Sequence, residues 1–258
     1  EVCGILNGTT NYILTRMIRS GLTFEAALKE AQANGYAEKD PTADVEGHDA
    51  CRKICILAAI AFGRHVYPRQ VPTEGISGVT LADVAYAESC NRKIKLLGRA
   101  VKEPDGRVCA YVAPHLVESE APLAGVEDVF NAIMVKGDAI GDVMFYGRGA
   151  GKLPTASAVV ADVMDAARHI QSRKRMEWGP GGEDVTVSPD QFPFRWYVRA
   201  SGSAGAVRTA FPGAALLSRP GAPADEVAFL TAAPMTREQL DAALGGDLRP
   251  LSVFRVLE

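Results

Sequence analysis

The sequence lacks the patterns that mark secreted and membrane proteins. Its five cysteines form no CxxC pair, and an odd number of cysteines without a signal peptide favours a reducing compartment. No apolar run reaches the roughly 18 to 20 residues that a membrane-spanning helix needs, because the run at 54–62 ends at Gly63. We therefore expect a cytoplasmic protein that does not span a membrane.

An excess of positive charge is also missing. The net charge is −3 and the pI is near 5.9, and no basic stripe with interleaved aromatic residues occurs, so we expect no nucleic-acid partner. Neither HExxH nor CxxC accompanies the four scattered histidines, so we expect no metal site. His48 beside Asp49 is an alternative base, although a structural or exposed histidine is the simpler interpretation. No serine lies in a GxSxG motif.

The residues that are present are those of a globular chain. A length of 258 residues with 47% hydrophobic residues predicts one large or two small domains, and the start at Glu1 instead of Met suggests a fragment. Apolar spacing and capping residues predict helices and strands in alternation. The expected helices cover 12–20, 23–34, 47–63, 81–90 and 155–171, and the expected strands cover 2–6, 93–102, 107–114, 131–136 and 143–146.

The last third of the sequence predicts a separate small module. Short strands and two helices follow in the order β-α-β-β-α-β, which is typical of a ferredoxin-like fold. We expect an α+β protein: a mixed sheet covered by helices in residues 1–172, a Gly/Pro-rich linker in 173–193, and the ferredoxin-like module in 194–258.

The most informative stretch is GYAEKDPTADVEGHDACRK, at 35–53. It places acidic side chains in a turn and then begins an amphipathic helix, which indicates a polar site mounted on a buried helix. Asp49 and Lys53 are four residues apart and share one helix face, so an exposed ion pair is one interpretation. The alternative is a lysine desolvated beside the apolar run at 54–57, with a lowered pKa and a role in proton transfer. Glu38 and Asp44 would face it across the turn.

A glycine-rich loop, GRGAG at 147–151, precedes the expected helix at 155–171. Such a loop lets backbone N–H groups approach phosphate or another polar ligand. It lacks the context of a dinucleotide fingerprint, so a tight strand-to-helix turn is an equal alternative.

Four motifs in fixed order resemble the homoserine dehydrogenase family. They are GILNGTTNYILTRM at 4–17, the acidic stretch at 35–53, IKLLG at 94–98, and the run from the GAG of 149–151 to PTASAVVADV at 154–163. The resemblance covers roughly residues 1 to 171 and implies an NAD- or NADP-dependent oxidoreductase that interconverts L-homoserine and L-aspartate 4-semialdehyde.

The resemblance also implies residue roles. Lys53 matches the proton donor, and Asp49 acts with it while holding the substrate. Glu38, Asp44, Tyr36 and Thr9 match substrate-binding positions. Gly149 and Gly151 fall in the loop that approaches the nicotinamide.

Family members begin with a nucleotide-binding domain that this sequence does not contain, so we expect a substrate-binding and dimerisation portion that is inactive by itself and forms a homodimer. The tail, Arg195 to Glu258, resembles an ACT module but has no PGV-type ligand loop. Threonine feedback and a purely structural or dimerising role both remain open for it. The alternative for the whole chain is a non-catalytic amino-acid-binding or oligomerisation module.

Overall fold

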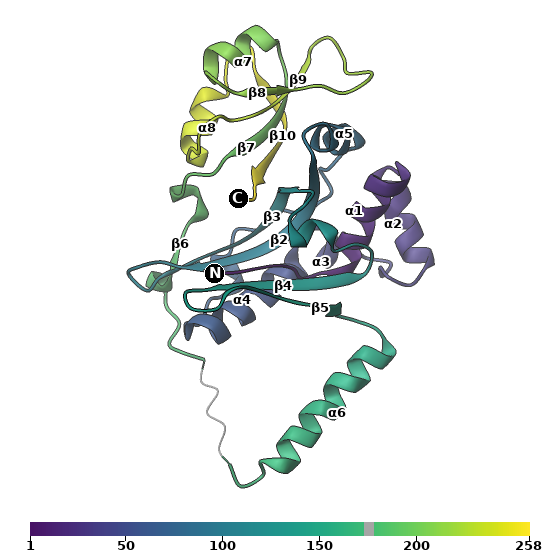
Figure 1. Ribbon diagram of the computed structural model, residues 1–258, viewed down its shortest axis with the longest axis vertical. Coiled ribbons are helices and arrows are strands. Elements are labelled where there is room, and N and C mark those ends of the chain that lie inside the picture. The colour runs from purple at the N-terminus through teal and green to yellow at the C-terminus, as the bar shows by residue number, and fades with distance from the viewer. Residues whose placement is uncertain (173–177) are drawn as a thin grey trace.

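The computed structural model describes residues 1–172 and 178–258, and a mixed ten-stranded sheet forms its centre. The strand order is β5-β4-β1-β2-β3-β10-β7-β9-β8, with β6 paired beside β3 (Figure 1). The strands are β1 (Val2–Ile5), β2 (Arg92–Lys102), β3 (Val108–Glu118), β4 (Phe130–Gly137), β5 (Gly141–Arg148), β6 (Thr186–Val187), β7 (Trp196–Ser201), β8 (Ala215–Leu217), β9 (Glu226–Leu230) and β10 (Arg249–Val256). The expected α+β class is confirmed.

Capping residues delimit the helices much as the sequence predicts. The side chains of Asn7, Thr23 and Thr80 accept hydrogen bonds from backbone N–H groups at the starts of α1, α2 and α5, and left-handed Gly21 and Gly63 end α1 and α4. The helices are α1 (Gly8–Ser20), α2 (Phe24–Ala33), α3 (Thr42–Val45), α4 (His48–Phe62), α5 (Leu81–Ser89), α6 (Lys152–Arg168), α7 (Ala204–Ala210) and α8 (Arg237–Ala243).

The first part of the chain packs its helices against the strands β1 to β4. Antiparallel pairing joins β1 to both β2 and β4, and joins β2 to β3 along their whole length. Helices α1 to α4 gather on one side of these strands (Figure 1). A Cβ atom at Gly98 would lie 2.8 Å from Leu6 Cδ1 and 3.3 Å from Ile54 Cβ. The glycine of IKLLG therefore lets β2 approach α4 closely.

The tail has the predicted element order β7-α7-β8-β9-α8-β10 and the strand order β10-β7-β9-β8. Its last strand also pairs in parallel with β3, at Arg255 with His115 and at Val256 with Leu116. The tail thus extends the main sheet at one end of the molecule (Figure 1). The sequence does not indicate this pairing.

Most of the expected linker lies within the described residues. Residues 173–177 lie outside them, but β6 pairs in parallel with β3 and two single-turn 3-10 helices, Glu183–Val185 and Pro189–Gln191, flank it. Val187 is buried beside Cys109 and Tyr111. This part of the chain is therefore packed against the first part, a feature that its Gly/Pro content does not reveal.

Helix α6 confirms the helix expected at 155–171, shifted by three residues toward the N-terminus. None of its residues is buried, its apolar side chains Leu153, Val159 and Val163 are exposed, and it extends away from the sheet (Figure 1). Among the described helices, including α6, none combines the length and apolar character needed to cross a bilayer.

Candidate active site

A cavity of about 440 Å³, which we call the acidic cavity, brings together residues from five separate parts of the chain. It lies among the start of α1, the turn after α2, helix α3 with the first turns of α4, the start of β4, and the glycine loop after β5. Its lining comprises Asn7, Gly8, Thr9, Gly35, Tyr36, Asp44, Asp49, Lys53, Val129, Asn131, Arg148, Gly149, Ala150 and Gly151. Seven of the eight predicted site residues are therefore neighbours in space.

Asn7 connects the acidic residues to the start of α1. Its Oδ1 accepts a hydrogen bond from Thr10 N at 2.9 Å and so caps the helix. Its Nδ2 donates to Asp44 Oδ1 at 2.7 Å and to Asp49 Oδ2 at 2.8 Å. One buried amide thus holds two carboxylates on one side of the cavity. The sequence indicated the cap but not the bridge.

The predicted ion pair of α4 is confirmed, with Lys53 Nζ 2.7 Å from Asp49 Oδ2. Nζ also donates to the carbonyl oxygen of Leu6 at 3.0 Å. The desolvation considered for Lys53 is not found, because its side chain is 46% exposed. Each residue turns about 100° around a helix axis, so the side chain of Lys53 points toward the cavity while the next residue, Ile54, is buried in the core.

Thr9 and Tyr36 form the opposite wall. The hydroxyl of Thr9 donates to the carbonyl oxygen of Tyr36 at 2.6 Å, which fixes the turn after α2 to the start of α1. The ring of Tyr36 packs edge-on against Tyr12, with 4.9 Å between centroids. Its outer face remains exposed, so it is available to a ligand in the cavity.

Glu38 is the predicted site residue that does not line the cavity. It is exposed, and its backbone carbonyl oxygen accepts a hydrogen bond from Gln32 Nε2 at 3.0 Å. The chain here runs along the outer surface before Asp40 accepts hydrogen bonds from Thr42 at the start of α3. The role expected for Glu38 therefore stays a prediction.

The glycine loop closes the cavity between β5 and α6. A Cβ atom at Gly149 would lie 3.0 Å from the amide of Asn131, so glycine leaves the backbone close to that side chain. Gly151 has a φ of 117° and directly precedes α6, whose first turn has no side-chain cap. The guanidinium of Arg148 lies 4.8 Å above the ring of Phe130. The strand-to-helix turn is confirmed, and the first turn of α6 leaves backbone N–H groups without a side-chain cap next to the cavity.

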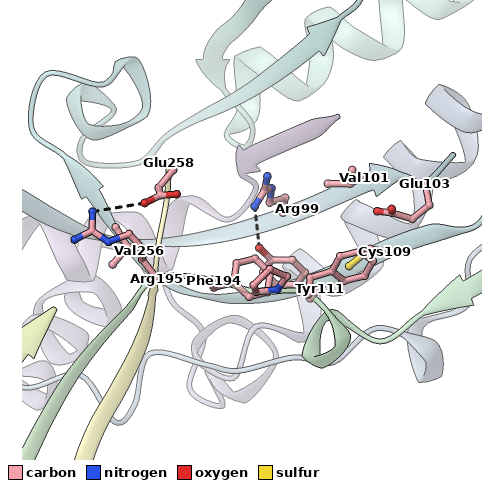
Figure 2. Close-up of a pocket in the computed structure, with 11 residues that line it drawn as sticks. Arg99, Val101, Glu103, Cys109, Tyr111, Phe194, Arg195, Val256 and Glu258 are labelled. Carbon is pink, nitrogen blue, oxygen red and sulfur yellow. Dashed lines mark hydrogen bonds and ion pairs between the residues drawn. The ribbon is translucent and has the colours of Figure 1, made fainter. Parts of the chain in front are cut away.

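A second cavity, of about 260 Å³, lies where the tail meets β2 and β3 and contains none of the predicted site residues. Figure 2 shows Arg99 extending toward the Tyr111 hydroxyl, 3.4 Å away, and Arg195 pairing with Glu258 at 3.6 Å. Arg99 also pairs with Glu1 at 2.8 Å, so both arginines have a carboxylate partner and the acidic cavity is the better candidate for catalysis.

The other candidate groups stay apart from the acidic cavity. His48 is exposed at the start of α4 and does not line it, and His115 is buried beside Tyr111. Within residues 1–172 and 178–258, no three His, Cys, Asp or Glu side chains are grouped so as to hold a metal ion. All five cysteines are free thiols.

Comparison with known proteins gives a consistent relationship. The sequence profile described as homoserine dehydrogenase matches residues 1–164. The homoserine dehydrogenase of Synechocystis sp. is 49% identical over 175 residues, which are 67% of this chain and 40% of that protein. The chain thus spans well under half the length of this curated relative.

Solved structures extend the likeness. A homoserine dehydrogenase from Thiobacillus denitrificans superposes with a TM-score of 0.84 at 32% identity, covering 100% of this chain and 64% of that one. A hyperthermophilic archaeal homoserine dehydrogenase in complex with NADPH gives 0.54 at 30% identity, covering 65% of this chain and 47% of that one. Sequence and fold agree: the chain belongs to the homoserine dehydrogenase family.

Proposed function

We propose that this chain carries the substrate-binding and proton-transfer groups of an NAD- or NADP-dependent homoserine dehydrogenase, in the part of metabolism that makes threonine, methionine and isoleucine. The reaction would interconvert L-homoserine and L-aspartate 4-semialdehyde. The observation that supports it most is the convergence of Asp44, Asp49 and Lys53 with the glycine loop around one cavity.

The carboxylates suit the amino end of the substrate. Asp44 and Asp49 each use one oxygen to accept from Asn7. Within the described part of the chain, Asp44 Oδ2 and Asp49 Oδ1 accept no hydrogen bond, so both can accept from a substrate ammonium. Thr9 and Tyr36 complete the pocket, and Glu38 would join them if the turn at 35–40 closes over the substrate.

Lys53 suits the reacting oxygen. Two of its three N–H groups donate to Leu6 and Asp49, which leaves one for a substrate oxygen. When the aldehyde is reduced, negative charge develops on its oxygen, and Lys53 would stabilise that charge and supply the proton. In homoserine oxidation Lys53 would start as the neutral amine and take the hydroxyl proton.

The glycine loop fits the edge of a nicotinamide cofactor, which when bound supplies the hydride exchange with the terminal carbon of the substrate. Gly149 and Gly151 place no side chain in the way, and the uncapped first turn of α6 offers N–H donors. Most cofactor contacts would come from residues outside this sequence. The choice between NAD and NADP would be made there.

Three further expectations belong to the same proposal. The 258 residues by themselves would show little or no turnover, because the chain spans only 40% of the Synechocystis relative. The working protein would be a cytoplasmic homodimer. The tail from 194 to 258 would be an ACT-like module that either binds threonine or serves assembly, with residues 1–172 as the catalytic unit and 173–193 as the connection.

Replacement of Lys53 by Met tests the proposal in a full-length enzyme that contains these residues. We expect homoserine oxidation to fall at least about 100-fold, because general acid–base groups contribute about 10²- to 10⁴-fold. Turnover is followed by nicotinamide absorbance. Lys102→Met, at an exposed position at the end of β2, is the matched control and should retain activity. Retained turnover in the Lys53 variant would refute the assignment.

Calorimetry separates the enzyme from a non-catalytic binding module. L-Homoserine and L-threonine are titrated into the 258-residue chain and into its Asp44→Asn variant. Binding of homoserine that Asp44→Asn weakens supports the acidic cavity as the substrate site. Threonine binding that is unaffected by the variant, without homoserine binding, would favour the module.

A further inference from the structure

A short segment between α4 and α5 packs against the α3–α4 turn that carries residues of the acidic cavity. Residues 72–76 run next to β3 like an added strand: Val112 N donates to Pro72 O at 2.9 Å, and Glu74 N donates to Val112 O at 2.8 Å. We call residues 72–76 the support segment. Its hydrogen bonds fix it to the centre of the sheet.

The support segment carries the turn between α3 and α4. Ile76 N donates to Val45 O at 2.8 Å. A Cβ atom at Gly75 would lie 2.3 Å from Val45 O, and one at Gly47 would lie 3.0 Å from Thr73 Cγ2. The backbone of the support segment therefore contacts the backbone of the turn directly. Because this contact is closely packed, a shift of the segment would move the turn.

The turn in question holds both carboxylates of the site. Asp44 directly precedes Val45, and Asp49 lies in the first turn of α4, which begins after Gly47. Asn7 reaches both carboxylates at 2.7 and 2.8 Å. These hydrogen bonds tolerate only small displacements, so the position of the turn decides whether the two carboxylates face one substrate.

On its other side the support segment is held by the tail. Arg255 of β10 donates from Nη1 to Glu74 Oε1 at 2.7 Å, and its side chain is 3% exposed. Its guanidinium lies 5.0 to 5.4 Å from the ring centroids of Tyr111, Phe194 and Trp196. Tyr111 and Phe194 also line the second cavity, which is shown in Figure 2. Stacking on three rings fixes the arginine and therefore the direction of its bond to Glu74.

We propose that Glu74 and Arg255 are positioning residues for the substrate-binding carboxylates of Asp44 and Asp49. Through them the tail sets the affinity of the acidic cavity for the substrate. The inference rests on the proposed function. The contact path runs from Arg255 to Glu74, through the support segment to Val45 and Gly47, and so to Asp44 and Asp49. An ordinary structural ion pair would affect folding stability but not substrate affinity.

Glu74→Gln in the full-length enzyme tests this, and because Glu74 is 41% exposed the variant should fold. We expect the KM for homoserine to rise about 2- to 30-fold, the range found when residues along a coupling path are changed. We expect kcat and the KM for the cofactor to change less than about twofold, because the lost interaction acts on substrate binding. Adding Arg255→Lys to Glu74→Gln should raise the homoserine KM no further.

Glu118→Gln is the matched control. Glu118 also accepts from a largely buried arginine, Arg92, at 2.7 Å, but it does not touch the support segment. Its KM for homoserine should equal that of the wild type. The inference is overturned if Glu74→Gln leaves this KM unchanged, if Glu118→Gln raises it equally, or if the Glu74 and Arg255 effects simply add. Wild-type enzyme that does not oxidise homoserine would instead refute the proposed function, and the inference with it.

Discussion

Asn7 shows how far a residue's role can be predicted from local sequence. The cap that it forms at α1 depends on Thr10, three residues away, and is therefore a local feature of the sequence. The bridge to Asp44 and Asp49 depends on how α3 and α4 fold back over β1, which no local pattern encodes. For the same reason Glu38 was expected beside them although the chain directs it outward. Residue identity indicated the chemistry, and the tertiary fold determines which of these side chains line the cavity.

His115 is buried and fits the expectation that the scattered histidines are structural. Its Nδ1 hydrogen-bonds to Ala113 O at 2.9 Å, and Tyr111 lies on its other side. Burial, together with the nearby positive charge of Arg255, lowers the pKa of His115 to about 3. The ring is therefore neutral in the folded protein at neutral pH.

We predict that His115 makes the fold sensitive to acid. Between pH 6.5 and 3 the unfolded chain binds a proton at this residue and the folded chain does not, so stability falls as the pH falls. From pH 7.5 to 4.5 the wild type should lose on the order of 2 kcal/mol more unfolding free energy than His115→Phe. Urea unfolding at the two pH values measures this. Parallel losses in the two proteins would contradict it.

Helix α4 is an element whose limits the sequence predicts closely, at 47–63 for an observed His48–Phe62. Gly47 and Gly63 adopt left-handed conformations, with φ of 79° and 64°, at the two ends expected from their positions around the apolar stripe. Glycines at helix ends can be recognised from neighbouring residues alone, because the left-handed conformation that they adopt is a local feature. The two glycines differ in surroundings, however, because Gly63 has open space while Gly47 faces the support segment.

We predict that this difference is measurable. A left-handed conformation costs a residue with a side chain about 1–2 kcal/mol, so Gly63→Ala should lower the unfolding free energy by about that amount. Gly47→Ala should cost more, because its Cβ would meet Thr73 Cγ2 at 3.0 Å and Val112 Cγ1 at 3.3 Å. Urea unfolding of both variants gives the comparison. Equal losses would show that the packing beneath Gly47 yields without cost.

Other elements were beyond prediction because their partners are distant in sequence. The two-residue strand β6 is shorter than any periodic signal and exists through its pairing with β3. The pairing of β10 with β3 likewise joins two strands that are far apart in the sequence, and a local sequence pattern does not predict such a contact. Local order within the tail was predicted, but its place in the sheet was not.

At the scale of the whole molecule, one buried polar cluster joins the tail to the first part of the chain. Asp83 of α5 is fully buried and accepts from Arg199 Nε at 2.8 Å, Tyr197 Oη at 3.0 Å and Ser252 Oγ at 3.1 Å. Arg199 continues the cluster to Glu226 at 3.0 Å. Strands β7, β9 and β10 are thereby tied to α5. The division at 172 and 194 stays a prediction, because the two parts share both a sheet and this cluster.

We predict that Asp83→Asn destabilises the protein by about 3–5 kcal/mol, the cost of leaving a buried charge without its partner. The charge in question is that of Arg199, whose side chain is 10% exposed. Asp241→Asn removes an exposed ion pair with Arg237 on α8 and should change stability by less than about 1 kcal/mol. Urea unfolding measures both. A loss below 1 kcal/mol for Asp83→Asn would mean that Glu226 alone compensates Arg199.

The position of β10 has a consequence for how the protein is made. Residues 249–256 lie between β3 and β7, which precede them in the chain. During synthesis β3 leaves the ribosome long before β10 does. The edge of β3 that pairs with β10 therefore stays unpaired until β10 has been made. Pairing of such distant segments slows folding, and unpaired edges invite association with other chains. The nascent protein therefore exposes this edge of β3 to association with other chains until residues 249–256 have left the ribosome.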